Sequence, residues 1–234
     1  MKYCYEYGSF NINYDIVYND RKNLKIIVNP NKEVVVEAPI NTNLELISNK
    51  VKKRAKWIYK QINFFDEFHP LTPPREYESG ETHYYLGKQY ILKVKEDIKN
   101  SVELFDNNLI INVKYRDNRK LIKDIIYSWY LNQAKIIFQN KLKEIEEKLD
   151  RYNFKSNKLI IKKLETRWGS CSKFGTITLN TELIKAPMNC IKYVILHELC
   201  HIKYKNHNQK FFRMLESVMP DWKKWKDKLE KTLS

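Results

Sequence analysis

Short apolar runs alternate with turn residues through the first 115 residues of the chain. Residues 24–40 read "LKIIVNPNKEVVVEAPI", in which an Asn-Pro-Asn turn separates two β-branched runs. Residues 82–94 and 102–113 show the same arrangement around Gly and Asp-Asn-Asn turns. Such spacing is typical of β-hairpins. The pattern therefore predicts a β-rich N-terminal region.

A helical period lies between the first two predicted hairpins. Thr42 and Glu45 have the spacing of a capping box, and the apolar residues after them recur every three or four positions. We expect an amphipathic helix with a basic outer surface, followed by a proline-containing loop over residues 69–81. The apolar positions are Leu44, Ile47, Val51, Ala55, Ile58, Ile62 and Phe65, and the basic ones are Lys50, Lys52, Lys53, Arg54, Lys56 and Lys60.

The period becomes helical again at Asp117 and stays so for about thirty residues. Residues 157–180 then contain β-branched runs broken by glycines, which predict two strands around a loop. Three helices are expected at the end of the chain: one after Pro187, one over residues 209–218 and one after Pro220. No internal repeat is evident in the sequence.

This order of elements predicts an α+β fold. We expect a β-hairpin-rich N-terminal region over residues 1–115, containing one amphipathic helix. A second domain over residues 116–234 is expected to combine a small sheet with the helix that follows Pro187.

The formal charge of +15 arises from 43 Lys and Arg against 28 Asp and Glu, spread along the whole chain. A basic surface can attract nucleic acid or an acidic partner, whereas ordinary solvated lysines would produce the same count. The sequence favours the second interpretation, because no nucleic-acid-binding motif stands out. Four cysteines without paired spacing, no signal peptide and no long apolar run lead us to expect a cytosolic protein that does not enter membranes.

The strongest chemical signal is H-E-x-x-H, formed by His197, Glu198 and His201. Four residues advance a helix by about one turn, so both imidazoles project from one face and can share one metal ion. Glu198 lies about 100° round the helix, from where its carboxylate can reach a water on that ion. The surrounding residues are strongly apolar, and burying these polar groups is costly unless they are paired or bind metal.

The third ligand has two candidates. His207 follows His201 at the distance found in H-E-x-x-H-x-x-G-x-x-H peptidases, although Tyr204 replaces the glycine, so we expect Asn206 to supply the turn through a positive φ. The alternative is Glu216 on the next helix, which would give two histidines and a glutamate.

Three protein ligands would leave one zinc position for water, which is the arrangement of a catalytic site. The chemistry expected is peptide-bond hydrolysis with Glu198 as general base. A closed structural site would need a fourth ligand such as Cys171 or Cys200. Cys200 points about 100° away from His201 and suits a core position better.

Several segments resemble the YgjP-like family of zinc metallopeptidases, which is related to the SprT and Spartan-type proteases. The resemblance lies in the segments "RWGSCS", "GTITLN", "LIKAP", "YVILHELCHIKYKNHNQKFF" and "MPDW", and extends to "RKNLKIIVNPNKEVVVEAPI", "KRAKWIYKQI" and "YYLGKQYILKV" in the first half. It thus covers nearly the whole chain.

The resemblance implies a zincin-like catalytic domain with zinc ligands His197, His201 and His207 and Glu198 as the base. It also implies that the "RWGSCS" segment lies beside the active-site helix, where Arg167, Trp168 and Ser170 would support the site or bind substrate. By analogy with zincins, residues 176–180 or 159–165 would pair with the substrate backbone as an added strand.

Two functions of different classes follow. The first is a zinc metallopeptidase that acts on peptides or proteins. The second is a basic nucleic-acid-binding protein with a structural or vestigial zinc site, and a protease recruited to DNA would combine the two.

Overall fold

The computed structural model describes residues 2–8, 10–29, 31–66 and 75–233, with the side chains of residues 2, 64–66 and 233 excepted. Contacts divide the chain into two compact units, one ending at Pro74 and one spanning Arg75–Leu233. The predicted boundary between residues 115 and 116 falls inside the second unit, because the sheet and the helix on either side of it share one core. The division into domains over residues 1–115 and 116–234 stays a prediction.

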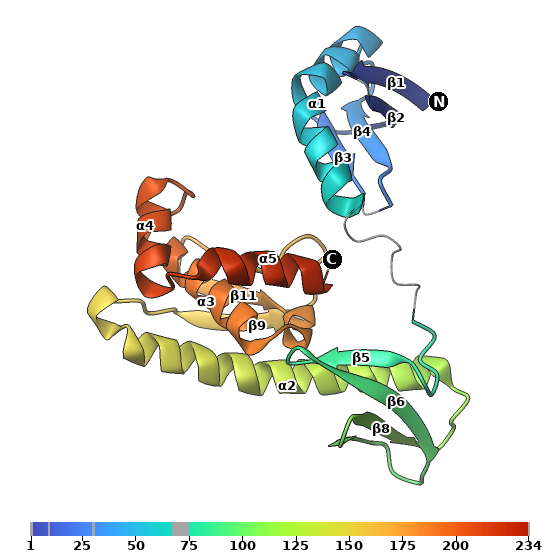
Figure 1. Cartoon of the computed structure of the whole chain (residues 1–234), viewed down its shortest axis with the longest axis vertical. Helices are drawn as coiled ribbons and strands as arrows, with labels where there is room; N and C mark the ends of the chain where they lie inside the picture. The colour runs from blue at the N-terminus through green and yellow to red at the C-terminus, as the bar shows by residue number, and fades with distance from the viewer. Residues whose placement is uncertain (1, 9, 30, 67–74, 234) are drawn as a thin grey trace. The chain divides into compact units, whose positions relative to one another are not determined.

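The first unit is a four-stranded sheet with one helix packed on it (Figure 1). The buried residues alternate along β2 and β4 and recur every three or four positions along α1, so one face of each element enters a common core. The elements are β1 (Lys2–Tyr7), β2 (Phe10–Asn19), β3 (Lys25–Val28), β4 (Val34–Pro39) and α1 (Leu44–Asp66).

The predicted helix of this unit is present, with small differences at its start. Asn43 caps α1, since its side-chain oxygen accepts from the backbone N–H of Glu45 at 3.0 Å, whereas the Thr42 hydroxyl donates to the Pro39 carbonyl. The predicted capping box was therefore wrong, because the capping residue is Asn43 and not Thr42. Leu44 is exposed instead of buried, and the side chain of Phe65 lies outside the described residues, as do residues 69–74 of the predicted loop.

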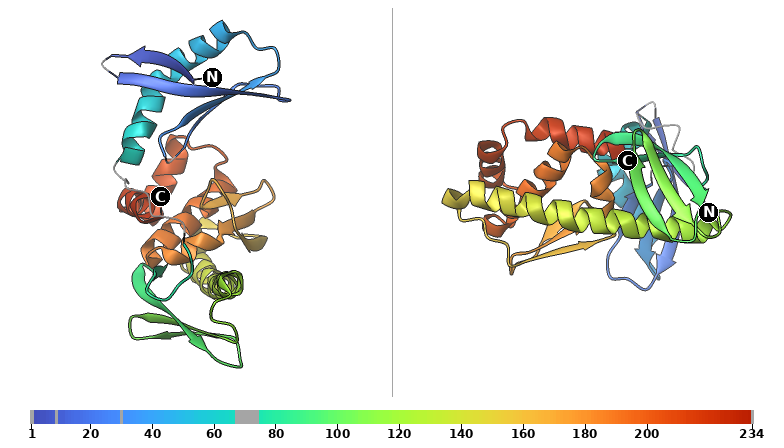
Figure 2. Two further views of the ribbon diagram at one scale, coloured as in Figure 1. Left: turned by 90° about the vertical axis from the view of Figure 1, so that its right-hand side faces the viewer. Right: turned by 90° about the horizontal axis from the view of Figure 1, so that it is seen from below.

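The second unit contains another four-stranded sheet, a long helix and a smaller three-stranded sheet with three further helices (Figure 2). Its elements are β5 (Thr82–Tyr85), β6 (Lys88–Glu96), β7 (Ser101–Phe105), β8 (Asn108–Val113), α2 (Arg119–Lys148), η1 (Asp150–Tyr152), β9 (Lys158–Lys162), β10 (Gly169–Cys171), β11 (Thr176–Asn180), η2 (Thr181–Lys185), α3 (Met188–Lys203), α4 (Gln209–Val218) and α5 (Trp222–Leu233). The predicted α+β class is confirmed.

Residues 157–180 hold three strands where two were predicted. β11 is central, pairing antiparallel with β10 and parallel with β9. β10 was not predicted because it is only three residues long and contains no β-branched residue. Because β11 is paired on both sides, residues 176–180 have no free edge to accept a substrate strand, and this alternative was wrong. Pairing of the substrate with residues 159–165 stays a prediction.

The two four-stranded sheets repeat one topology, which sequence inspection missed. In each, the first two strands are antiparallel, the second pairs in parallel with the fourth, and the third and fourth are antiparallel. A helix follows the fourth strand in both, capped by Asn43 in one and by Asn118 in the other. The buried residues match at positions 75 apart: Val34 and Leu109, Val36 and Ile111, Ala38 and Val113, Ile47 and Ile122, Val51 and Ile126, Ala55 and Tyr130.

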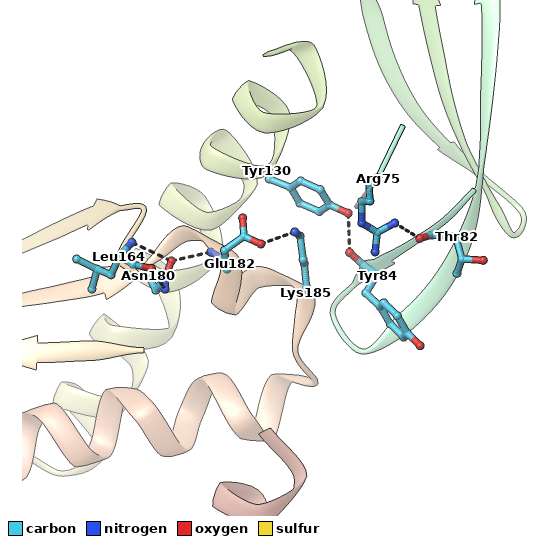
Figure 3. Close-up of polar contacts among 8 residues, drawn as sticks. All are labelled: Arg75, Thr82, Tyr84, Tyr130, Leu164, Asn180, Glu182 and Lys185. Atoms are coloured by element: carbon cyan, nitrogen blue, oxygen red, sulfur yellow. Dashed lines mark hydrogen bonds and ion pairs between the residues drawn. The ribbon is translucent and has the colours of Figure 1, made fainter. Parts of the chain in front are cut away.

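In the second unit this module is joined to η2 through the β5–β6 turn. The backbone N–H groups of Leu86 and Gly87 donate to the carbonyls of Ile184 and Lys185 at 3.0 Å each. Within the module, the Tyr130 hydroxyl on α2 donates to the Tyr84 carbonyl at 2.6 Å (Figure 3). The module is therefore fixed to the η2 segment that leads into α3.

No helix in residues 2–66 or 75–233, as far as they are described, combines the length and the apolar character needed to cross a bilayer.

We expect Gly87→Ala to destabilise the second unit more than Gly80→Ala does. Both glycines have positive φ, +81° and +104°, which costs an alanine about 1–2 kcal/mol. A Cβ on Gly87 would also lie 2.9 Å from Pro187 Cα, whereas one on Gly80 meets nothing within 4 Å. Chemical denaturation should show a loss for Gly87→Ala at least about 1 kcal/mol larger. Equal losses of unfolding free energy in the two variants would mean that the close approach of the turn to Pro187 does not affect stability.

Candidate metal centre

His197 and His201 lie one turn apart on α3, and His207 lies in the loop before α4. The Nε2 atom of His207 is 2.9 Å from that of His197 and 3.1 Å from that of His201. Within the described residues, these three form the one group of histidine, cysteine or carboxylate side chains with the spacing of a metal site. Glu216, the alternative third ligand, is not in the group.

The chain returns to the helix without the turn predicted at Asn206. α3 ends at Lys203, and the next residue, Tyr204, is extended with φ −122° and ψ 103°. Asn206 is not among the described residues with positive φ. That expectation was wrong, because an extended residue directly after the helix redirects the chain. Asn208 then caps α4, its side-chain oxygen accepting from the N–H of Phe211 at 3.0 Å.

Phe211 lies beneath the three imidazoles, and its role escaped the sequence analysis. Its ring centroid is 5.0, 4.6 and 4.7 Å from the rings of His197, His201 and His207, and the residue is fully buried. Phe211 and Leu215, four residues apart, are the buried residues of α4 and form its inner face. It thus packs the imidazoles from below and excludes water on that side.

A hydrogen bond fixes the tautomer of His201. Its Nδ1–H donates to the Tyr204 carbonyl at 2.9 Å, which leaves a lone pair on Nε2, the atom that faces His207. Burial lowers the pKa of His201 and lowers that of His197 to about 3, with the neighbouring histidines adding to the shift at His197. Both rings are therefore neutral near pH 7, as metal ligation requires.

The three nitrogens suit a tetrahedral metal ion. Ligands about 2.0–2.1 Å from a zinc ion would lie about 3.3 Å from one another, close to the separations observed. Neutral imidazole is also a preferred ligand of zinc. The donor set therefore fits the ion that the sequence suggested.

Glu198 lies next to the cluster with its carboxylate buried at 5% exposure. Its Oε2 has no hydrogen-bond partner among the described residues. Burial raises the pKa of Glu198 to about 8, opposed by the positive charge of Arg167. A buried carboxyl oxygen without a partner, on the residue next to His197, can accept a proton or contact a cation.

Strand β10 contacts α3 at Glu198, as expected for the "RWGSCS" segment. A Cβ on Gly169 would lie 2.8 Å from Glu198 Oε1, so the strand approaches the carboxylate closely only because residue 169 is a glycine. Arg167 is exposed and near enough to act on Glu198 by its charge. Trp168 packs against the core, and no described contact joins Ser170 to the histidines.

Asn180 holds this segment in place (Figure 3). Its side-chain N–H groups donate to the carbonyls of Leu164 and Arg167 at 2.9 and 3.0 Å. Its oxygen accepts from the N–H groups of Leu164 and Glu182 at 3.3 and 3.1 Å. Both N–H groups and the oxygen of the side chain are thus hydrogen-bonded, and they connect the segment before Gly169 to the start of η2. This role leaves no pattern in the sequence, since all the partners of Asn180 are backbone groups.

Comparison with known proteins found similar solved structures and one matching family model. Two similar solved structures are the metallopeptidase zymogens abylysin of Pyrococcus abyssi and jannalysin of Methanocaldococcus jannaschii, at 25% and 27% identity and a TM-score of 0.37 each. The matches cover 41% and 42% of the present chain and 94% and 97% of theirs. No curated protein matches the chain.

The model of the YgjP-like metallopeptidase domain matches residues 22–232. That range includes all three histidines, Glu198 and most of both units. The chain therefore belongs to the YgjP-like family of metallopeptidases.

Proposed function

We propose that this metallopeptidase uses zinc held by His197, His201 and His207, with Glu198 as general base, to hydrolyse peptide bonds. Two observations carry the proposal. The Nε2 atom of His207 lies 2.9 Å from that of His197 and 3.1 Å from that of His201. Glu198, next to His197, has a buried carboxylate oxygen without a hydrogen-bond partner. Three ligands leave a zinc position for solvent.

A bound zinc ion would supply a Lewis acid that makes water nucleophilic near neutral pH and polarises a carbonyl. The protein residues have their own tasks. Glu198 would be ionised once a neighbouring cation offsets the effect of burial on its pKa. It then accepts a proton from the attacking water and delivers it to the nitrogen of the departing amine. Gly169 and Asn180 set the position of β10 against that carboxylate, and Phe211 keeps the imidazoles oriented.

A closed structural site receives no support from the described residues. The group contains three ligands, and neither Cys171 nor Cys200 belongs to it. Cys200 is fully buried in the core, as the sequence suggested, and burial raises the pKa of its thiol to about 12. A thiol that resists ionisation is a poor zinc ligand.

Metal content tests the ligand set. We expect one zinc per chain in the parent protein, measured by elemental analysis after dialysis, and at least about tenfold weaker affinity in His207→Ala. His197→Ala should behave similarly. Glu216→Gln is the matched control, because Glu216 is exposed and lies outside the cluster. Loss of zinc in Glu216→Gln with retention in His207→Ala would reverse the assignment.

Glu198→Gln tests the general base separately from the metal. The amide keeps the shape of the side chain but cannot take a proton, so kcat on a quenched fluorescent peptide library should fall about 10²–10⁴-fold. Zinc content should remain at the parent level. A variant as active as the parent would remove Glu198 from the mechanism.

Gly169→Ala tests whether β10 positions Glu198. The backbone of Gly169 has no positive φ, so the substitution acts through the new methyl group, which would meet Glu198 Oε1. We expect kcat to fall at least about tenfold with zinc retained, since small misplacement of a catalytic group is costly. Ser170→Ala on the same strand is the control and should keep most activity. Equal activity in both variants would contradict the positioning role.

A further inference from the structure

The outer face of α1 carries basic residues that its module does not require. Lys50, Lys52, Lys53, Arg54, Lys56 and Lys60 are all exposed, and no acidic residue occurs between Glu45 and Asp66. Within residues 2–66, as far as described, none of the six is paired with a carboxylate. Their summed charge therefore faces solvent and can attract a polyanion.

The repeated topology supplies an internal comparison. On α2, the positions 75 residues later are Ile125, Tyr127, Ser128, Trp129, Leu131 and Lys135, of which one is basic. The inward positions are apolar in both helices. On the other face, Ile125 and Trp129 of α2 pack against the core of the second unit, whereas the matching positions of α1 face solvent. The ββββα module therefore folds without a basic helix face, and its fold does not require the basic residues of α1.

The face also includes an aromatic side chain. Trp57 is 38% exposed, and Lys50, Lys53 and Lys60 lie seven and four residues before it and three after it. Residues at these spacings share one stripe of a helix. An indole between ammonium groups can stack on a base while the lysines contact phosphates on either side.

We propose that the outer face of α1 binds single-stranded nucleic acid, through Lys50, Lys53 and Lys60 on the phosphates and Trp57 on a base. Lys50 to Lys60 extends over about 15 Å of helix, which corresponds to about four nucleotides of a strand. The inference does not depend on the proposed function, because it concerns the first unit and not the metal centre.

Nucleic acid is favoured over an acidic protein by Trp57. Charge alone would serve either partner, but an exposed indole within a lysine stripe adds a surface that matches unpaired bases. Duplex DNA would use the lysines and leave the indole unused, since its bases are already stacked.

The test measures binding of the full chain to a fluorescent ten-nucleotide oligothymidylate by anisotropy, over a range of salt concentrations. We expect the logarithm of the association constant to fall linearly with the logarithm of salt concentration. The triple variant Lys50→Gln, Lys53→Gln, Lys60→Gln should reduce the steepness of that line by about 2. Trp57→Ala should weaken binding about tenfold at fixed salt, with partial recovery in Trp57→Phe.

The control is a triple variant with the same change of charge elsewhere: Lys93→Gln, Lys95→Gln, Lys99→Gln, all exposed in or after β6. It should bind nearly as the parent does. Equal loss in both triple variants would show diffuse attraction and overturn the proposal, as would absence of binding at low salt. Binding of polyglutamate as tight as that of the oligonucleotide, unaffected by Trp57→Ala, would assign the face to an acidic protein instead.

Discussion

The site depends on the crowding of three imidazole nitrogens in a partly buried space. Nitrogen lone pairs that approach within about 3 Å repel one another unless a proton or a cation lies between them. Burial disfavours the proton, as the lowered pKa values of His197 and His201 indicate. The arrangement is therefore stabilised best by a metal ion, and the surrounding fold supplies the packing that keeps the rings together.

Most of that packing comes from parts of the chain far from the motif. Phe211 reaches the rings from α4, and β10 reaches Glu198 through a glycine. Asn180 connects β10 to η2, and η2 in turn holds the β5–β6 turn through Leu86 and Gly87. A carboxylate with a raised pKa is thus held by a chain of backbone contacts that extends into the preceding module.

The sequence predicted the local features well, because they depend on side-chain period and turn chemistry. The α+β class, α1, α2 and the hairpin β3–β4 follow from such patterns, as does the pairing of His197 with His201 on one helix face. The parallel pairing of β2 with β4 could not be predicted, since it joins strands separated by another strand. Gly169 and Asn180 act through close approach and backbone contacts, which leave no periodic signal.

The repeated module has a consequence for folding. Two sheets of the same topology in one chain offer strands that could pair with the wrong copy, a recognised route to misassembly between similar neighbours. The cores differ in volume at matched places: Ala55 corresponds to Tyr130 and Ala38 to Val113. An exchanged strand or helix would leave a void in one copy and overfill the other. The different side-chain volumes in the two cores thus make an exchanged strand or helix less stable than the native pairing. The sequence difference between the two copies therefore favours pairing of each strand within its own sheet.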